Sequence, residues 1–337
     1  MSQAGWPATV AATGVGSLPG IDPLTTATWV LDEMADLPHL PELPDRGLGA
    51  DAIGRSAGLL VDLPVEATPG GWQVTGRPGS DLATARRLLT DDLAALEIAA
   101  HGYSGPLKVQ VVGPITLAAS LGRPLGEAAL GDRGLLRDIT ASLAEGVRLH
   151  LADVTARVPG ARLVLQVDEP SLPLALGGRL RTRSGWGQLP RPEPHVVQTL
   201  LAEVLESGAD ATVVHCCGRQ VPVGLLVAAG AGAVSFDIDL VQPAELDGLA
   251  GAVESGTRLV IGAVPTAHAP PGKAVADRVV DLWGRLGFRT AVMHAHTLVS
   301  PACGLAGRST EHSAAIYRAA REAAAQVAER DSVGPAG

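Results

Sequence analysis

Short apolar runs of strand length alternate along the chain with longer segments whose apolar residues recur every three or four positions. The short runs predict β-strands, and the periodic segments predict amphipathic helices. The predicted strands are Val10–Val15, Leu107–Val112, Arg162–Val167, Ala211–His215, Ala233–Asp237, Arg258–Gly262 and Ala291–Leu298, with a further proline-interrupted strand near Leu37–Leu43. The predicted helices are Pro23–Ala35, Asp81–Ala100, Leu135–Arg157, Pro194–Glu206, Pro243–Glu254, Lys273–Leu286 and Thr310–Ala328.

This alternation implies parallel strands joined by helices. About eight strand–helix units in one chain favour an α/β fold of the closed (β/α)8, or TIM barrel, type. No linker divides the chain, so residues 1–330 are predicted to form a single domain, followed by a disordered tail, Asp331–Gly337. The Gly- and Pro-rich stretch Glu42–Gly79 is predicted to be a long active-site loop with one helix near Ala50–Leu60, and Arg179–Pro192 to be a second insertion.

Charge and composition exclude several classes of function. A net charge of −9 argues against nucleic acid or an anionic membrane as the main partner. No run approaches the roughly 20 apolar residues of a spanning helix, and Met1 to Val10 lacks the features of a secretion signal, so a cytoplasmic location is expected. The two lysines are Lys108, expected at the start of a strand, and Lys273, after a turn. A Schiff-base mechanism is therefore disfavoured.

The three cysteines all lie at predicted strand ends, where barrel enzymes carry their catalytic groups. His215, Cys217 and Cys303 supply one imidazole and two thiols, which are typical ligands of Zn²⁺. The H-x-C spacing on an extended strand end places the first two on one face. The alternative is that Cys216 and Cys217 are small buried hydrophobic residues and His215 is a core histidine.

Two carboxylates stand at further strand ends. Asp237 could supply a fourth, oxygen ligand that an incoming thiol displaces. Asp168, in Asp168-Glu169-Pro170, could hold the ammonium group of an amino-acid substrate, or the same residues could simply begin a helix.

The first strand is followed by Gly14-Val15-Gly16-Ser17, which lacks the full dinucleotide-binding pattern. Its bare backbone N–H groups could instead receive a substrate carboxylate.

Six motifs, in order, resemble the catalytic domain of cobalamin-independent methionine synthase over about Thr13 to Arg308. They are Val15-Gly16-Ser17, Gly113-Pro114-Ile115-Thr116, Gln166-Val167-Asp168-Glu169-Pro170, His215-x-Cys217, Ser235-Phe236-Asp237 and Pro301-Ala302-Cys303-Gly304-Leu305.

The resemblance implies a zinc-dependent S-methyltransferase that methylates the thiol of homocysteine to form methionine. It implies that His215, Cys217, Asp237 and Cys303 hold the zinc. Homocysteine would be bound by Val15, Gly16 and Ser17 at its carboxylate and by Asp168 and Glu42 at its amine. The catalytic histidine of the family matches His268, although Ala267 fits the motif spacing equally well.

The chain also departs from the family pattern. The usual glutamate ligand is replaced by Asp237, the tryptophan beside the pterin by Ser120, and the Arg-Cys folate contact has no counterpart after Trp72. A second, N-terminal barrel is absent, so the chain resembles the short, core-only enzymes. The methyl donor is thus expected to be either methyl-tetrahydrofolate or a corrinoid carrier protein.

Other functions fit parts of the same pattern. A zinc transferase acting on another thiol, such as coenzyme M, also uses H-x-C-G, but it would have no use for Asp168 and Ser17 as an amino-acid grip. A uroporphyrinogen-decarboxylase-like enzyme shares the fold but needs no metal, so the cysteines would have no function as ligands. A non-catalytic metal-binding barrel is compatible with the fold, which does not determine function.

Overall fold

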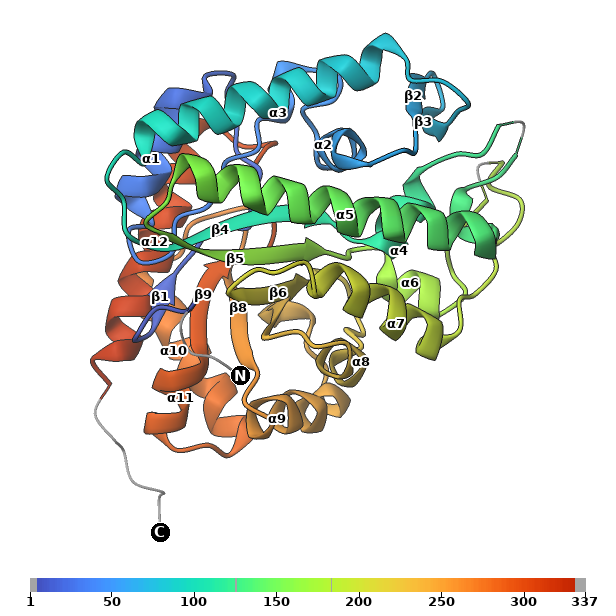
Figure 1. Ribbon diagram of the computed structural model, residues 1–337. Helices are drawn as coiled ribbons and strands as arrows, with labels where there is room; N and C mark the ends of the chain where they lie inside the picture. Colours follow the sequence, from blue (N-terminus) through green and yellow to red (C-terminus); the bar gives the residue numbers. More distant parts are fainter. Residues whose placement is uncertain (1–4, 125, 183, 331–337) are drawn as a thin grey trace.

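The computed structural model describes residues 5–124, 126–182 and 184–330. Seven parallel strands form one curled sheet in the order β1-β9-β8-β7-β6-β5-β4 (Figure 1). Their bounds are β1 Ala11–Ala12, β4 Gly105–Val112, β5 Ala161–Asp168, β6 Ala211–His215, β7 Ala233–Asp237, β8 Arg258–Val264 and β9 Thr297–Pro301. The α/β class and the parallel sheet are therefore confirmed. The predicted tail Asp331–Gly337 lies outside the described residues.

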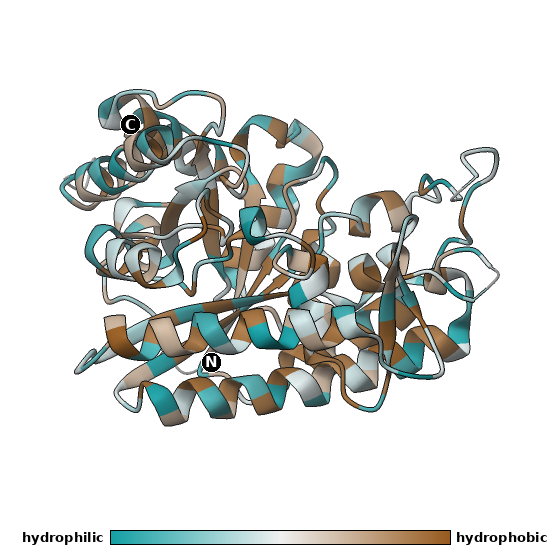
Figure 2. Cartoon of the chain, turned by 90° about the horizontal axis from the view of Figure 1, so that it is seen from above, coloured by the Kyte–Doolittle hydropathy of each residue, from teal (hydrophilic) through white to brown (hydrophobic). Residues whose placement is uncertain are grey.

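Helices surround the outer face of the sheet, and their apolar sides turn toward it (Figures 1 and 2). The longer ones are α1 Pro23–Glu33, α2 Ala52–Leu59, α3 Ser80–Ala99, α5 Arg133–Arg157, α7 Pro194–Leu205, α9 Leu246–Glu254, α10 Gly272–Leu286 and α12 Thr310–Ala328. Shorter ones are α4 Pro114–Ser120, α6 Leu172–Leu176, α8 Val223–Ala228 and α11 Thr290–His296. Within the described residues, no helix is long and apolar enough to cross a membrane.

The inner face of the sheet carries polar side chains. All eight residues of β4 are buried, as expected of a parallel strand covered on both faces. Lys108 and Gln110 are two positions apart and therefore share one face, the interior, where Lys108 Nζ donates a hydrogen bond to Gln166 Oε1 of β5 over 2.7 Å. Lys108 lies in the middle of β4 and not at its start.

The predicted strand near Leu37–Leu43 is present only as isolated bridges, His39 to Lys108 and Ser17 to Glu42. The backbone N–H of Leu40 donates to the carbonyl of Lys108 over 2.9 Å, and that of Leu18 donates to the carbonyl of Glu42 over 2.9 Å. This segment therefore contacts both β4 and the chain that follows β1. Its two prolines remove backbone donors, which explains why it forms no continuous ladder.

Two predicted strands differ from the structure. Val10–Val15 contributes only the two residues of β1. The strand prediction Ala291–Leu298 is wrong for most of its length, because α11 covers Thr290–His296 and β9 begins at Thr297. A short apolar run cannot distinguish a strand from a half-buried helix. The Glu42–Gly79 stretch contains α2 as expected, and also an unpredicted hairpin of β2 (Val65–Thr68) and β3 (Gly71–Val74).

Candidate metal centre and substrate pocket

The carboxyl ends of the parallel strands meet at one edge of the curled sheet, and the predicted site residues gather there. Asp168 ends β5, His215 ends β6, Asp237 ends β7, and Cys303 follows β9. Asp168 and His215 are direct partners in the β5–β6 register. This edge is where α/β barrels carry their catalytic groups.

The side chains of His215, Cys217 and Cys303 converge at this edge. One ligand atom from each lies within 4.8 Å of the others. The two Sγ atoms are 3.5 Å apart. The Nδ1 atom of His215 lies 2.8 Å from the hydroxyl of Ser235, and its buried Nε2 has no hydrogen-bond partner among the described residues. The alternative, a core histidine with satisfied nitrogens, does not fit this geometry.

The two thiols of this group are electrostatically coupled. The hydrogen bond that Cys217 donates, together with His215, lowers the pKa of Cys303 to about 4. That same hydrogen bond, with burial, raises the pKa of Cys217 above its usual range. One thiolate therefore forms readily beside a protonated thiol, and a bound cation would favour the loss of the second proton.

Asp237 lies farther from this centre. It is half-buried, and its Oδ1 accepts a hydrogen bond from the backbone N–H of Asp239 over 2.9 Å. Its carboxylate is not among the ligand atoms that fall within the 4.8 Å group of described residues. Burial raises its pKa, and the charge of Cys303 adds to that effect, so the two groups interact electrostatically.

A second polar cluster consists of Glu42, Asp168 and Lys108, and lies inside the curled sheet. Burial is the main cause that raises the pKa of Glu42 to about 7. The charge of Arg55, whose Nε lies 3.6 Å from Glu42 Oε1, opposes that rise, and the charge of Asp168 adds to it. Burial also raises the pKa of Asp168, while His215 and Lys108 oppose that rise. The pKa of Lys108 is lowered to about 8 by burial, against the pull of both carboxylates.

The Val15-Gly16-Ser17 loop connects the two clusters. The carbonyl of Val15 accepts hydrogen bonds from Lys108 Nζ over 2.9 Å and from Gln166 Nε2 over 2.8 Å. The carbonyl of Ser17 accepts from the N–H of Leu305, two residues after Cys303. A Cβ atom on Gly304 would overlap the Ser17 hydroxyl, so this glycine permits the close approach. The loop is thus held beside both the cysteines and the carboxylates.

Glu169 plays a different part from its neighbour Asp168. Its fully buried carboxylate accepts hydrogen bonds from the N–H groups of Ile115 and Thr116, each over 2.8 Å, and from the Thr116 hydroxyl over 2.7 Å. It therefore caps α4, while Asp168 is left facing the site. The alternative that Asp168, Glu169 and Pro170 simply begin a helix does not hold, because α6 begins at Leu172 and its N-cap residue is Ser171.

Three polar residues of the site, Lys108, Gln110 and Gln166, were given no role by the sequence analysis, although Gln166 stands in one of the six motifs. Gln166 Nε2 donates to Asp168 Oδ1 over 2.7 Å, and Gln110 Nε2 donates to the carbonyl of Leu40 over 2.6 Å. They orient the predicted substrate-binding residues. The signal that could have revealed them is polar side chains at every second position of otherwise apolar strands.

His268 lies exposed in the loop that follows β8, at the carboxyl edge of the sheet. Ala267, which fits the motif spacing equally well, is also exposed. The same loop contacts α12, where His312 Nε2 lies 3.2 Å from the carbonyl of Thr266. The structure places the loop at the correct edge but brings His268 into none of the clusters described above.

Comparisons with known proteins identify the family of the chain and a structure with a similar fold. The family model described as "Cobalamin-independent synthase, Catalytic domain" matches residues 104–326. A B12-independent methionine synthase from Shewanella sp. W3-18-1, solved in complex with selenomethionine, has 12% sequence identity and a TM-score of 0.61, covering 95% of this chain and 98% of that one. The carboxyl transferase domain of pyruvate carboxylase from Rhizobium etli has 12% identity and a TM-score of 0.27, with 100% and 56% covered, too weak a likeness to use. No curated protein matches.

Proposed function

The chain belongs to the family of cobalamin-independent synthase catalytic domains, a family of methionine synthase-like methyltransferases, and from this premise we propose that it methylates the thiol of homocysteine to form methionine. The observation that carries the proposal is the convergence of His215, Cys217 and Cys303 beside the carboxylates of Glu42, which is buried, and Asp168, which is half-buried. One group suits a thiol-activating metal, and the other suits the ammonium of an amino acid.

We propose zinc as the metal, held by His215, Cys217 and Cys303 with Asp237 as the fourth ligand. Two sulfurs bound to one tetrahedral zinc, each at about 2.3 Å, lie roughly 3.8 Å apart. The observed separation of 3.5 Å is close to that value. The unpartnered His215 Nε2 supports the same assignment, because the hydroxyl of Ser235 contacts the other ring nitrogen, Nδ1, and so orients the ring as a metal ligand requires.

Bound zinc would supply the positive charge that keeps a substrate thiol deprotonated near neutral pH. The protein residues then position the rest of the substrate. Asp168 and Glu42 would accept hydrogen bonds from the substrate ammonium. The N–H groups of the Val15-Gly16-Ser17 loop would donate to its carboxylate. Lys108 neutralises part of the carboxylate charge and, by donating to the carbonyl of Val15, holds this loop in place.

The structural neighbour supports an amino-acid acceptor, since it was solved with selenomethionine, the selenium analogue of methionine. We propose a methyl-tetrahydrofolate as the donor, because the family is described as cobalamin-independent. Nothing in the comparisons supports the corrinoid carrier considered from the sequence. We retain His268 as the proposed catalytic histidine, on the strength of the motif match and its place at the carboxyl edge.

We further propose that residues 1–330 form one domain, a closed (β/α)8 barrel in which residues 37–43 take the place of the eighth strand. Support comes from the hydrogen bonds of this segment to β4 on one side and to residues 16–18 on the other. A cytoplasmic location is consistent with the three free cysteines.

The test is zinc content and methionine formation on purified protein, with homocysteine and either methyl-tetrahydrofolate or methylcobalamin. One zinc per chain and turnover with the folate would support the full proposal. Turnover with methylcobalamin alone would overturn the donor assignment. Zinc without methionine from either donor would indicate another thiol or a non-catalytic metal site, and a chain that binds no zinc would contradict the proposal altogether.

A further inference from the structure

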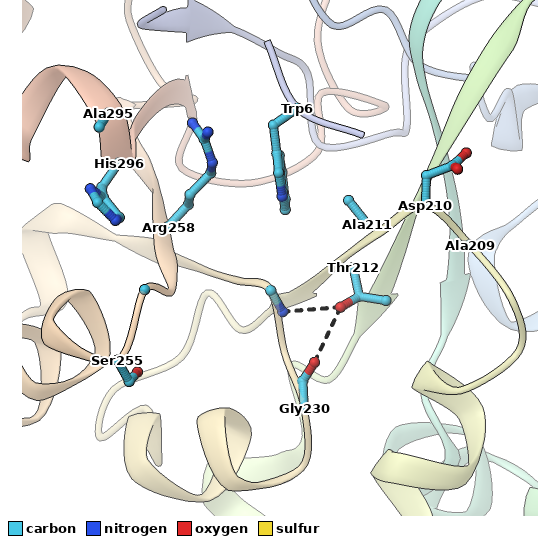
Figure 3. Close-up of a pocket in the computed structure, with 12 residues that line it drawn as sticks. Trp6, Ala209, Asp210, Ala211, Thr212, Gly230, Ser255, Arg258, Ala295 and His296 are labelled. Carbon is cyan, nitrogen blue, oxygen red and sulfur yellow. Dashed lines mark hydrogen bonds between the residues drawn. The ribbon is translucent and has the colours of Figure 1, made fainter. Parts of the chain in front are cut away.

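A cavity of about 360 Å³ opens at the face opposite the metal centre, at the amino ends of β6, β7 and β8 (Figure 3). Trp6, Thr212, Arg258 and His296 line it, together with backbone of the loops that precede β7 and β8. Its size falls in the ordinary range of small-molecule sites. Barrel enzymes use this face for stability and not for catalysis, so a built pocket here calls for a separate explanation.

The feature that sets this cavity apart is the guanidinium of Arg258. Arg258 is buried, with 8% of the residue exposed, and its Cζ atom lies 5.5 Å from the centroid of the Trp6 ring (Figure 3). Its Nη1 atom is buried without a hydrogen-bond partner among the described residues. Burial lowers the pKa of Arg258, and no neighbouring carboxylate of the described chain opposes that shift.

A buried cation that lacks both a counter-ion and a full set of acceptors is costly, and proteins rarely keep one without a use. The acidic group nearest in the lining, Asp210, is exposed at the rim, and its Oδ2 already accepts from the N–H of Leu163 over 2.7 Å. His296 has its Nδ1 bonded to the carbonyl of Val292 over 3.0 Å, which leaves Nε2 for another partner. Among the described residues, therefore, no carboxylate of the lining pairs with Arg258.

We propose that this cavity is a second binding site, for a small organic oxyanion whose phosphate or carboxylate group pairs with Arg258. The planar guanidinium presents paired donors that match either group. A cavity of about 360 Å³ is much larger than an inorganic ion needs, so the anion carries an organic body that packs beside Trp6. The site is independent of methyl transfer at the opposite edge.

The test is a titration of the purified chain, followed through the indole N–H signal of Trp6 in ¹⁵N NMR, which Trp6→Phe identifies among the five tryptophans. The probes are ribose 5-phosphate and citrate, with inorganic phosphate as the minimal anion and sodium chloride to hold ionic strength constant. We expect a saturable shift with at least one organic anion, weaker binding of inorganic phosphate, and at least tenfold weaker binding in Arg258→Met. The organic probe that binds distinguishes a phosphate-bearing from a carboxylate-bearing ligand.

Arg148→Met is the matched control, since Arg148 is an exposed arginine of α5 paired with Glu145. It should bind as the unmodified chain does. A response that does not saturate, or that is equal in Arg258→Met, would show only non-specific anion effects and would overturn the proposal. If Arg258→Met fails to fold, Arg258→Lys, which keeps the charge and loses the planar fork, should bind severalfold more weakly, and unchanged affinity there would equally contradict it.

Discussion

The Sγ atoms of Cys217 and Cys303 lie 3.5 Å apart although 86 positions separate the two residues in the sequence. One follows β6 and the other follows β9, and two further strands, β7 and β8, stand between them in the sheet. The curl of the sheet is therefore what brings them together. Thiols this close are either coupled through a proton or bound to a common cation.

We expect Cys217→Ser and Cys303→Ser each to reduce bound zinc and methyl transfer by at least about 100-fold, because a serine hydroxyl stays protonated and is a poor zinc ligand. Zinc is measured by metal analysis of the purified variants. Cys216→Ala is the control, since Cys216 is fully buried and lies outside the ligand group. Loss of zinc in that control, or full zinc content in both serine variants, would contradict the assignment.

Asp168→Asn should raise the KM for homocysteine by roughly 10- to 100-fold, because a hydrogen bond between charged groups contributes about 1.5–3 kcal/mol. The discriminating substrate is 4-mercaptobutanoate, which is homocysteine without its amine. Turnover of that thiol should change little in the variant. An equal loss with both thiols would show that Asp168 supports the metal centre and not the ammonium.

Some helices and strands of the structure agree with the sequence prediction, and others do not. Thr310–Ala328, Ala211–His215 and Ala233–Asp237 are predicted to the residue, because each has a strong period or a sharp boundary. The strand predicted over Ala291–Leu298 is a helix up to His296, because a short apolar run carries too little periodicity to distinguish the two.

Of the site residues, likewise, the sequence identifies some and not others. Cysteine and histidine are typical metal ligands, so the candidate ligands can be found from the sequence alone. Lys108 does not, because its role depends on a buried hydrogen bond to Gln166 and on two carboxylates that only the curled sheet brings near. A cavity such as that beside Arg258 has no sequence signal of its own.

The pKa of Glu42, raised by burial to about 7, predicts a pH dependence for substrate binding. Below about pH 7 the folded protein holds this carboxyl protonated, and a neutral carboxyl attracts an ammonium weakly. The KM for homocysteine should therefore rise as pH falls from 8 to 6. In Glu42→Gln, the part of this rise in KM that comes from protonation of Glu42 should be absent. The difference between the KM–pH profiles of the native chain and the variant therefore separates the titration of Glu42 from that of the metal ligands. Parallel profiles would contradict the role of Glu42.

The raised pKa of Glu42 also makes the free energy of unfolding depend on pH. Because the folded pKa lies above the usual 4.5, the folded protein holds a proton that the unfolded chain has released between about pH 4.5 and 7. Raising the pH through that window therefore destabilises the substrate-free protein at this group. Glu42→Gln should lose less stability than the unmodified chain over the same interval, as measured by urea unfolding.

Gly14 precedes the Val15-Gly16-Ser17 loop and packs against buried side chains. A Cβ atom there would overlap the hydroxyl of Tyr317 and Nε2 of His39, which are hydrogen-bonded to each other over 2.7 Å. Both rings are buried, so neither can move without opening the core. Gly14→Ala should destabilise by about 1–3 kcal/mol or more, as overpacking does.

Gly251 is the matched control for Gly14. It lies on the exposed side of α9, with nothing within 4 Å of an added Cβ atom. Gly251→Ala should stabilise by about 0.5–1 kcal/mol, because alanine restricts the unfolded chain and favours helix. Each variant adds one methyl group to the native chain. Changes of opposite sign in the free energy of unfolding would therefore assign the effect of Gly14→Ala to the lack of space around Gly14. A neutral Gly14→Ala would mean that the His39–Tyr317 pair does not fix the loop leading to Ser17.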